Sequence, residues 1–156
     1  MSPRAAWRLE SLGFTDVYDY VGGKADWAAA GLPVEGRAAT ATRLGQLARS
    51  DVLTCGLAET VATVRSRLVD HEAAAVVNDE RVVLGLVRAV DLGDDGERPV
   101  AEVMREGPST YRPNLTAAET APRLEGKKVA RVVVTTSDGR LVGIADPDHI
   151  RDAAGT

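Results

Sequence analysis

The side chains that most often carry enzyme chemistry are few in this sequence and stand far apart. There is one cysteine, Cys55, and there are two histidines, His71 and His149. A structural zinc site needs several Cys or His ligands at short spacing, and neither histidine has such neighbours. No serine, cysteine or pair of carboxylates stands in a recognisable catalytic arrangement. The residue types alone therefore favour a protein that is not an enzyme and holds no metal.

Three other features fit structural roles. Gly22-Gly23 lacks the lysine and hydroxyl residue of a phosphate-binding loop, so it is interpreted as a turn. The acidic stretch 91–97 contains glycines and is expected to be a solvated linker rather than a cation site. Cys55 has no partner for a disulfide within the chain, and we expect it to be a buried structural thiol.

The elements that could position a site occur twice. Residues 44–77 and 100–133 follow one pattern of apolar positions in constant register, so that Leu44 matches Val100. Each copy then passes through a polar turn into a second apolar run that contains a glycine, Gly85 or Gly143. A unit this short cannot bury its own apolar face and must pack against its twin. The function is therefore expected to lie between the copies.

Each copy has the element order β-α-β-β-α. In the first, Val61, Val64 and Leu68 recur every three or four residues and predict a helix. The apolar runs 73–77 and 82–87, separated by a polar turn, predict two strands covered on both faces. The fold class predicted is α/β or α+β, with two pseudo-symmetric motifs packed as one module.

The composition is that of a globular chain. Its 156 residues are 44% hydrophobic and 27% charged, which is enough to bury a core. The net charge of -4 leaves no long basic stripe, so nucleic acid is not an expected partner. No apolar run approaches the roughly 20 residues of a membrane-spanning helix, and residues 1–4 lead into no signal-type stretch. A cytoplasmic location without membrane contact is the expectation.

The repeat resembles a tandem pair of CBS domains, the Bateman module. The residues that carry the resemblance are the β-α-β-β-α order, Val103-Met104 and the Gly-Leu-Val-x-x-x-Asp-Leu segment at 85–92. The likeness covers about residues 42–154 and predicts motifs at 42–96 and 97–156. It implies two clefts that often hold adenine nucleotides such as AMP or ATP. It also implies association, and we expect a homodimer.

The resemblance implies one nucleotide site per chain. In the family's motif an aspartate holds the ribose hydroxyls, and Asp91 stands at that position. Arg88 replaces the hydroxyl residue that meets phosphate. Thr54 is expected to line the same cleft. In the second copy Asp146 and His149 occupy these two positions, and a carboxylate facing a phosphate would repel it, so that cleft is expected to stay empty. Both copies also allow a structural interpretation. Asp91 would then cap a short helix, and Asp146-Pro147 would be an N-cap followed by proline at the first helical position.

Residues 1–41 resemble the C-terminal end of a rhodanese-like sulfurtransferase domain, through Arg4-Ala5-Ala6, Gly13-Phe14 and Gly31-Leu32-Pro33-Val34. The family's cysteine loop would lie before Arg4, so sulfur transfer is not expected. The segment is predicted to form a helix over 3–12 and a strand over 17–20. It should lay four apolar side chains against the CBS pair or a partner: Trp7, Leu9, Phe14 and Trp27.

Three functional readings follow. The first is a non-catalytic sensor that binds an adenosine-type ligand and acts on an unidentified protein partner. The second is a ligand-free scaffold for dimerisation or protein interaction. The third, an enzyme related to rhodanese, is disfavoured by the missing cysteine loop.

Overall fold

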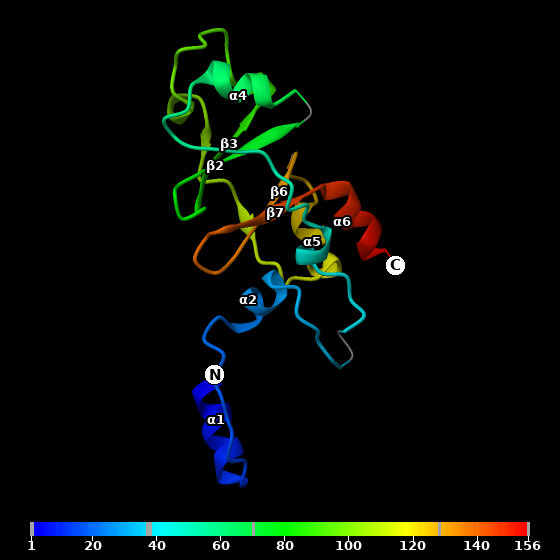
Figure 1. Cartoon of the computed structure of the whole chain (residues 1–156). Coiled ribbons are helices and arrows are strands. Elements are labelled where there is room, and N and C mark those ends of the chain that lie inside the picture. The colour runs from blue at the N-terminus through cyan, green and yellow to red at the C-terminus, as the bar shows by residue number, and fades with distance from the viewer. Residues whose placement is uncertain (1, 37–38, 70, 128, 156) are drawn as a thin grey trace.

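The computed structural model describes residues 2–36, 39–69, 71–127 and 129–155. Two small sheets lie next to one another, with helices on their outer sides, and the N-terminal segment extends away from them (Figure 1). The predicted mixed α/β class with paired motifs is confirmed. No helix among the described residues is long and apolar enough to cross a membrane.

The first sheet has the strand order β1-β2-β3-β4. The strands are β1 (Thr54–Cys55), β2 (Ala73–Val77), β3 (Val83–Arg88) and β4 (Arg105–Glu106). β1 is parallel to β2, and the other pairs are antiparallel. Helix α4 (Val61–Arg67) covers this sheet and begins after Thr60, whose hydroxyl accepts a hydrogen bond from the backbone N–H of Thr63 at 3.3 Å. A single 3-10 turn, η1 (Ala89–Asp91), follows β3.

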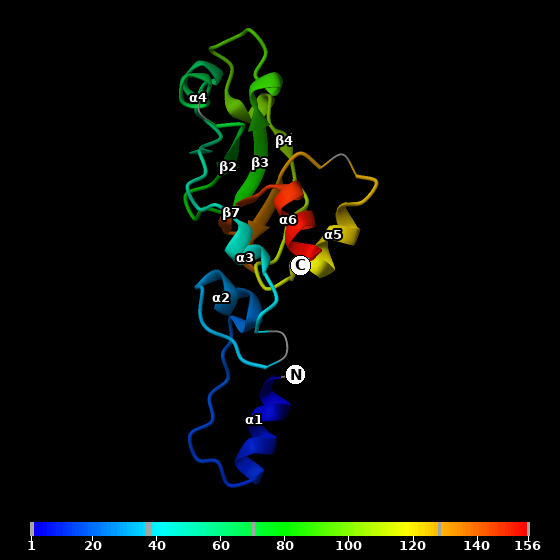
Figure 2. The same ribbon diagram turned by 90° about the vertical axis from the view of Figure 1, so that its right-hand side faces the viewer.

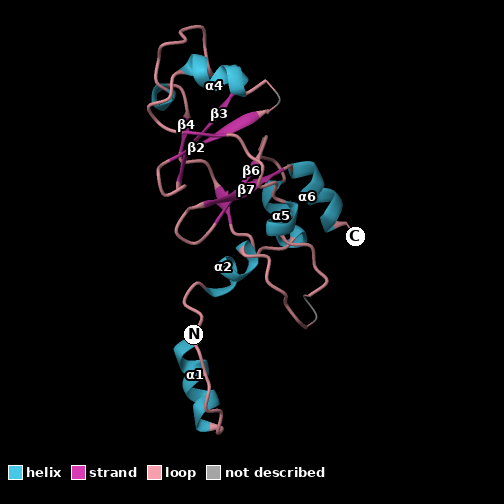
Figure 3. Ribbon diagram, in the orientation of Figure 1, coloured by secondary structure: helices cyan, strands magenta, loops and turns pink. Residues whose placement is uncertain are grey.

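The second sheet has the order β5-β6-β7. Its strands are β5 (Thr110–Tyr111), β6 (Val132–Thr135) and β7 (Leu141–Ala145), and it is preceded by the 3-10 turn η2 (Val100–Glu102). Helices α5 (Ala117–Leu124) and α6 (Pro147–Ala154) pack side by side next to this sheet (Figure 3). α5 begins with a capping box, in which Thr116 and Glu119 each bond the other's backbone N–H.

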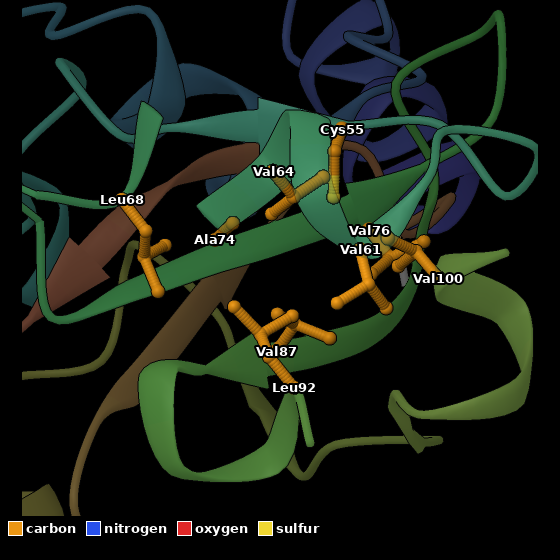
Figure 4. Packing of buried hydrophobic residues seen from close by; sticks show 9 residues of the cluster. All are labelled: Cys55, Val61, Val64, Leu68, Ala74, Val76, Val87, Leu92 and Val100. Carbon is orange, nitrogen blue, oxygen red and sulfur yellow. The ribbon is translucent and has the colours of Figure 1, made fainter. Parts of the chain in front are cut away.

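Alternate positions of β2 face two different cores, as the period of two in a strand requires. Ala74 and Val76 point toward α4, where they pack with Val61, Val64 and five further buried side chains of the cluster (Figure 4). Ala75 and Val77 point the other way and meet Val133 of β6. The two sheets are thus joined by a small apolar core of their own. The predicted burial of the α4 face is confirmed, since Val61 and Val64 are fully buried.

The two copies are related by reciprocal contacts, as a pseudo-twofold axis requires. Val83 donates its backbone N–H to Gly139 at 3.0 Å, and Leu141 donates to Arg81 at 2.9 Å. The hairpin turns touch at this one place, and the strands do not merge into one continuous sheet.

The segment that leads into each copy packs on the other copy. Helix α3 (Leu44–Leu47) begins the first copy, yet its Leu44 donates to the carbonyl of Leu115 at 2.9 Å and is buried in the core of the second. Val100 begins the second copy, donates to Glu59 at 2.8 Å and is buried in the core of the first. The two copies therefore exchange their lead segments: the first residues of each copy pack in the core of the other.

This exchange explains the glycine in the second apolar run of each copy. A Cβ atom on Gly143 would lie 2.4 Å from the backbone oxygen of Arg49, which forms an antiparallel bridge with Ile144 of β7. A Cβ atom on Gly85 would lie 2.6 Å from the sulfur of Met104 and 3.0 Å from the oxygen of Arg105. Each glycine leaves the space through which the other copy's lead segment passes.

The N-terminal segment departs from the prediction in two respects. Helix α1 (Ser2–Ser11) is confirmed, but residues 17–20 form no strand, because no neighbouring strand is there to pair with them. α1 also stands clear of the CBS-like body in both views (Figures 1 and 2), so its side chains do not pack there. Most exposed large apolar side chains of the described residues lie in this segment: Trp7, Leu9, Leu12, Phe14, Tyr18, Tyr20, Val21, Trp27, Leu32 and Val34.

Helix α2 (Gly23–Ala29) connects this segment to the body. Asp26 accepts a hydrogen bond from the hydroxyl of Ser137 at 3.3 Å, and the carbonyl of Ala28 lies close to Gly45 in α3. Within the segment, the Trp27 indole donates to the carbonyl of Pro33 at 2.8 Å, and its ring meets Tyr20 edge to face. Of the four apolar residues expected to pack, Trp27 is thus held mainly by its own segment.

Candidate functional site

A cavity of about 310 Å³ lies between the two copies. One wall comes from the lead segment and β2 of the first copy, and the other comes from β6, β7 and the start of α6 in the second. The residues around it are Leu47, Arg49, Asp51, Val52, Leu53, His71, Glu72, Ala73, Arg131, Ile144, Ala145, Asp146 and His149. The cavity is therefore at the Asp146 cleft, which the family motif had predicted to be empty.

Charged side chains from both copies meet in this cavity. Arg131 forms ion pairs with Glu72 of the first copy and with Asp146 of the second, the latter at 3.2 Å. Arg49 pairs with Asp51 at 2.7 Å on the opposite wall. Arg131 thereby links the two copies across the cleft.

The two histidines line this same cavity. His71 precedes β2 and His149 lies in the first turn of α6, so the two come from different copies. The sequence analysis treated them as unrelated because they lie in different copies and neither has neighbouring Cys or His ligands. The available signal was the repeat itself, which places the start of a β-strand in one copy beside the start of the last helix in the other.

Asp146 has the structural role that the sequence allowed. It is the N-cap of α6, where its carboxylate accepts the backbone N–H of Asp148 at 2.8 Å, and Pro147 occupies the first helical position. The other carboxylate oxygen accepts from Arg131. The helix N-terminus, which in other proteins is a ready anion site, is here occupied by the chain's own carboxylate.

The structure brings Arg88 and Asp91 together, but it leaves Asp91 with no free acceptor position. Its two oxygens accept four hydrogen bonds: from the Arg88 backbone N–H at 3.1 Å, from two Arg88 guanidinium nitrogens at 2.9 and 3.1 Å, and from Arg105 at 3.1 Å. A carboxylate offers about four lone-pair positions. Asp91 therefore caps η1 and binds the lead segment of the second copy, and these bonds would have to break before a ribose could be held.

Thr54 is not brought to Arg88 and Asp91. β2 lies between β1 and β3, so Thr54 is two strand spacings, about 10 Å, from the strand that ends at Arg88. Its carbonyl accepts a hydrogen bond from Arg67 at 2.8 Å. The residues just before it, Val52 and Leu53, line the cavity at Asp146. The exchange of lead segments accounts for this, because each lead segment contributes to the cleft of the other copy.

The Asp91 network predicts a pH-dependent contribution to stability. We expect Asp91→Asn to lower the free energy of unfolding by about 2 kcal/mol at neutral pH, because charge-assisted hydrogen bonds are lost at a nearly buried carboxylate. Hydrogen bonding from the Arg88 guanidinium holds the pKa of Asp91 below its usual range. Such a group stabilises the fold at pH values above its unfolded pKa, and the contribution is lost as the pH falls through the lower folded pKa.

The difference in the free energy of unfolding between the native chain and Asp91→Asn should therefore be largest at pH 6 to 7 and shrink progressively below about pH 4. Urea unfolding at several pH values measures it. Asp79→Asn, a change at an exposed turn, is the control and should have little effect at any pH. A difference that stays constant down to pH 2 would contradict the role of the charge.

The part of the chain that the structure describes contains neither an exposed thiol nor a cluster of metal ligands. Cys55 is buried in the core of the first copy, and burial raises the pKa of its thiol to about 11. A thiol of this kind is a poor nucleophile at neutral pH. Among the described residues, no group of three or more His, Cys, Asp or Glu side chains could hold a metal ion.

Comparison with known proteins agrees with this geometry. The family model for the CBS domain matches residues 100–155. The folded chain is similar to solved structures of CBS domains, with TM-scores above 0.6. The chain has the fold of a CBS-domain pair. No curated protein matches the sequence.

Three of the structures similar to this CBS pair contain adenosine compounds. The cytosolic domain of the Mg²⁺ channel MgtE, in complex with ATP, has a TM-score of 0.65 and 24% identity over 71% of this chain and 48% of that one. CBSX2, a protein of Arabidopsis thaliana, in complex with AMP, has a TM-score of 0.63 and 21% identity over 72% and 96%. The CBS pair of protein MJ0100, with 5′-methylthioadenosine and S-adenosyl-L-methionine, has a TM-score of 0.62 and 16% identity over 74% and 97%. The chain spans about half the length of the two magnesium-transporter structures.

Proposed function

We propose that this CBS pair is a non-catalytic regulatory module that binds an adenosine-type ligand in the cavity at Asp146. The observation that carries the proposal is a cavity of about 310 Å³ with walls from both copies. This volume is at the lower end of the range for small-molecule sites. The adenosine compounds in three similar structures support the ligand class.

A ligand in this cavity would act on the arrangement of the two copies. It would touch His71 and Ala73 on one wall and Ile144 and His149 on the other. A ligand shifts a conformational equilibrium only by its differential affinity for the two states. Since the walls belong to different copies, any change in their spacing changes the contacts of the ligand. The bound and free modules would then present different surfaces to a partner protein.

The Arg88, Asp91 and Thr54 set is the alternative location for the ligand. A nucleotide there would have to displace Arg88 or Arg105 from the Asp91 carboxylate. If it does so, Asp91→Ala should weaken binding about tenfold, the scale of one charge-assisted hydrogen bond. If the ligand occupies the cavity at Asp146, the same variant should leave the affinity nearly unchanged.

The ligand proposal predicts a binding loss from filling the cavity. Ala73 belongs to the face of β2 that looks away from α4 and lines the cavity, so Ala73→Leu should occupy ligand space. Calorimetry should give one site per native chain and a loss of affinity of at least about tenfold in the variant. Ala118→Leu, on the exposed side of α5, adds the same bulk elsewhere and should bind as the native chain does. Equal affinities of the native chain and the two variants would exclude the cavity as the ligand site.

The scaffold is the second candidate function. It is favoured by the charged groups of both clefts, which are already paired within the chain. We propose a homodimer in either case, and failure of every adenosine compound to bind would leave the scaffold as the function. The described CBS body exposes few large apolar side chains, namely Leu57, Val69 and Val90, whereas the N-terminal segment exposes many.

For residues 1–41 we retain the rhodanese-like origin as a proposal. Helix α1 supports it, and the missing strand at 17–20 speaks against it. The segment reaches the body through α2 and exposes Trp7 and Phe14 at 68% and 60% of their surface. A binding role is a better fit than catalysis, because the cysteine of the described chain is buried elsewhere.

A further inference from the structure

We infer that the cavity at Asp146 selects adenosine compounds without phosphate, whose 5′ substituent is neutral or positively charged. This inference rests on the proposed function and names the ligand class of the same site. Two separate features of the structure carry it: the state of the helix N-terminus at the cavity and the balance of charges on the cavity walls.

The first feature is the N-terminus of α6. A helix N-terminus binds phosphate through its unpaired backbone N–H groups and the positive end of its dipole. Here the Asp146 carboxylate accepts the N–H of Asp148 at 2.8 Å, so the carboxylate of the N-cap residue already occupies this position. A phosphate at this point would meet negative charge where the fold ordinarily offers donors. The aspartate thus rejects phosphate without closing the cavity.

The second feature is the charge of the walls. Arg49 and Arg131 are the guanidinium groups in the cavity lining, against the carboxylates of Asp51, Glu72 and Asp146. Each arginine is already paired with one or two of these carboxylates. With both histidines neutral, the lining carries a formal charge of -1. A nucleotide that brings two to four negative charges would have to break these pairs, whereas a sulfonium or ammonium group would be attracted.

The inference is tested with five probes on the full chain: adenosine, 5′-methylthioadenosine, S-adenosyl-L-methionine, AMP and ATP. Calorimetry at pH 8 measures the affinity of each probe. We expect 5′-methylthioadenosine and S-adenosyl-L-methionine to bind at least about tenfold more tightly than AMP and ATP, the scale of one charge-assisted contact. AMP or ATP binding as tightly as these would overturn the inference and leave the proposed function standing. Failure of all five probes to bind would remove both.

Asp146→Asn tests the residue itself. Asparagine is also a good N-cap, so the variant removes the charge and keeps the helix start. Affinity for S-adenosyl-L-methionine should fall roughly tenfold and affinity for AMP should rise by about threefold or more, while the neutral 5′-methylthioadenosine changes little. Asp146→Ser, another N-cap residue, should reproduce the pattern and guards against a folding defect in the first variant.

The matched control is Asp148→Asn. It makes the same change of charge two residues further along α6, outside the cavity lining, where Asp148 pairs with Arg151. The affinity of this variant for each probe is expected to change by less than twofold. Equal effects of Asp146→Asn on the charged and the neutral probes, or an equal effect of the two asparagine variants, would show that Asp146 does not discriminate by charge.

Discussion

We expect Gly143→Ala to lower the free energy of unfolding by about 3 kcal/mol, at the upper end of the cost of overpacking a core. The new Cβ atom would lie 2.4 Å from the backbone oxygen of Arg49 and 2.9 Å from its carbonyl carbon. Backbone cannot rotate away as a side chain can, so the lead segment of the first copy must move off β7. In thermal unfolding the melting temperature should fall by roughly 10 °C.

Substitutions at two other glycines serve as controls for this result. Gly85→Ala should cost less, because the nearest atom is the sulfur of Met104, the far end of a flexible side chain. Gly56→Ala should have the smallest effect, since nothing lies within 4 Å of its Cβ position. The expected order of destabilisation is therefore Gly143, then Gly85, then Gly56. A Gly143→Ala variant as stable as Gly56→Ala would mean that the lead segment does not pack against β7 at Gly143.

The elements of the CBS pair could be predicted because each repeats a simple pattern. Val61, Val64 and Leu68 recur at helical spacing and are buried against the sheet, as expected. Residues 73–77 are apolar throughout because one face of β2 meets α4 and the other meets the second sheet. The prediction was wrong for residues 17–20, where the strand expected in the rhodanese-like segment has no partner.

The exchange of lead segments could not be predicted from the repeat. Leu44 and Val100 occupy equivalent positions, and the pattern is the same whether each packs on its own copy or on the other. Only the contacts distinguish the two arrangements. The choice also decides which cleft each lead segment reaches, which is why Thr54 was assigned to the cleft at Asp91 although Val52 and Leu53 line the other.

A residue can occupy the position that a motif requires while its functional group is already bonded to other residues. The motif assigned Arg88 and Asp91 to one nucleotide site, and in the structure the two side chains form an ion pair. Whether a carboxylate can hold a ribose depends on its other partners. One of these, Arg105, comes 14 positions later and reaches Asp91 only through β4. Asp146 was predicted to repel phosphate and so to leave its cleft without a nucleotide, and the structure has a cavity there. A carboxylate changes which ligands fit a cavity without removing the cavity.

Leu44→Ala is the direct test of the exchange, and its expected effect is as large as that of Gly143→Ala. Leu44 is fully buried, so losing three carbons leaves a cavity and should cost about 3 kcal/mol. The location of the damage is the informative result. Leu44 packs in the cluster that contains Leu124, Val132 and Ile150, so the loss of stability should be felt first in the second copy.

Native-state hydrogen exchange locates that damage, because it reports the stability of separate parts of one chain. In Leu44→Ala the amides of β6 and α6 should lose more protection than those of β2 and β3. Leu57→Ala is the matched control; this leucine is 39% exposed, so its truncation should cost well under half as much. Greater loss in β2 and β3 would place Leu44 on its own copy. It would also return Thr54 to the cleft of Asp91, because the lead segments and the strands that follow them determine which residues line each cleft.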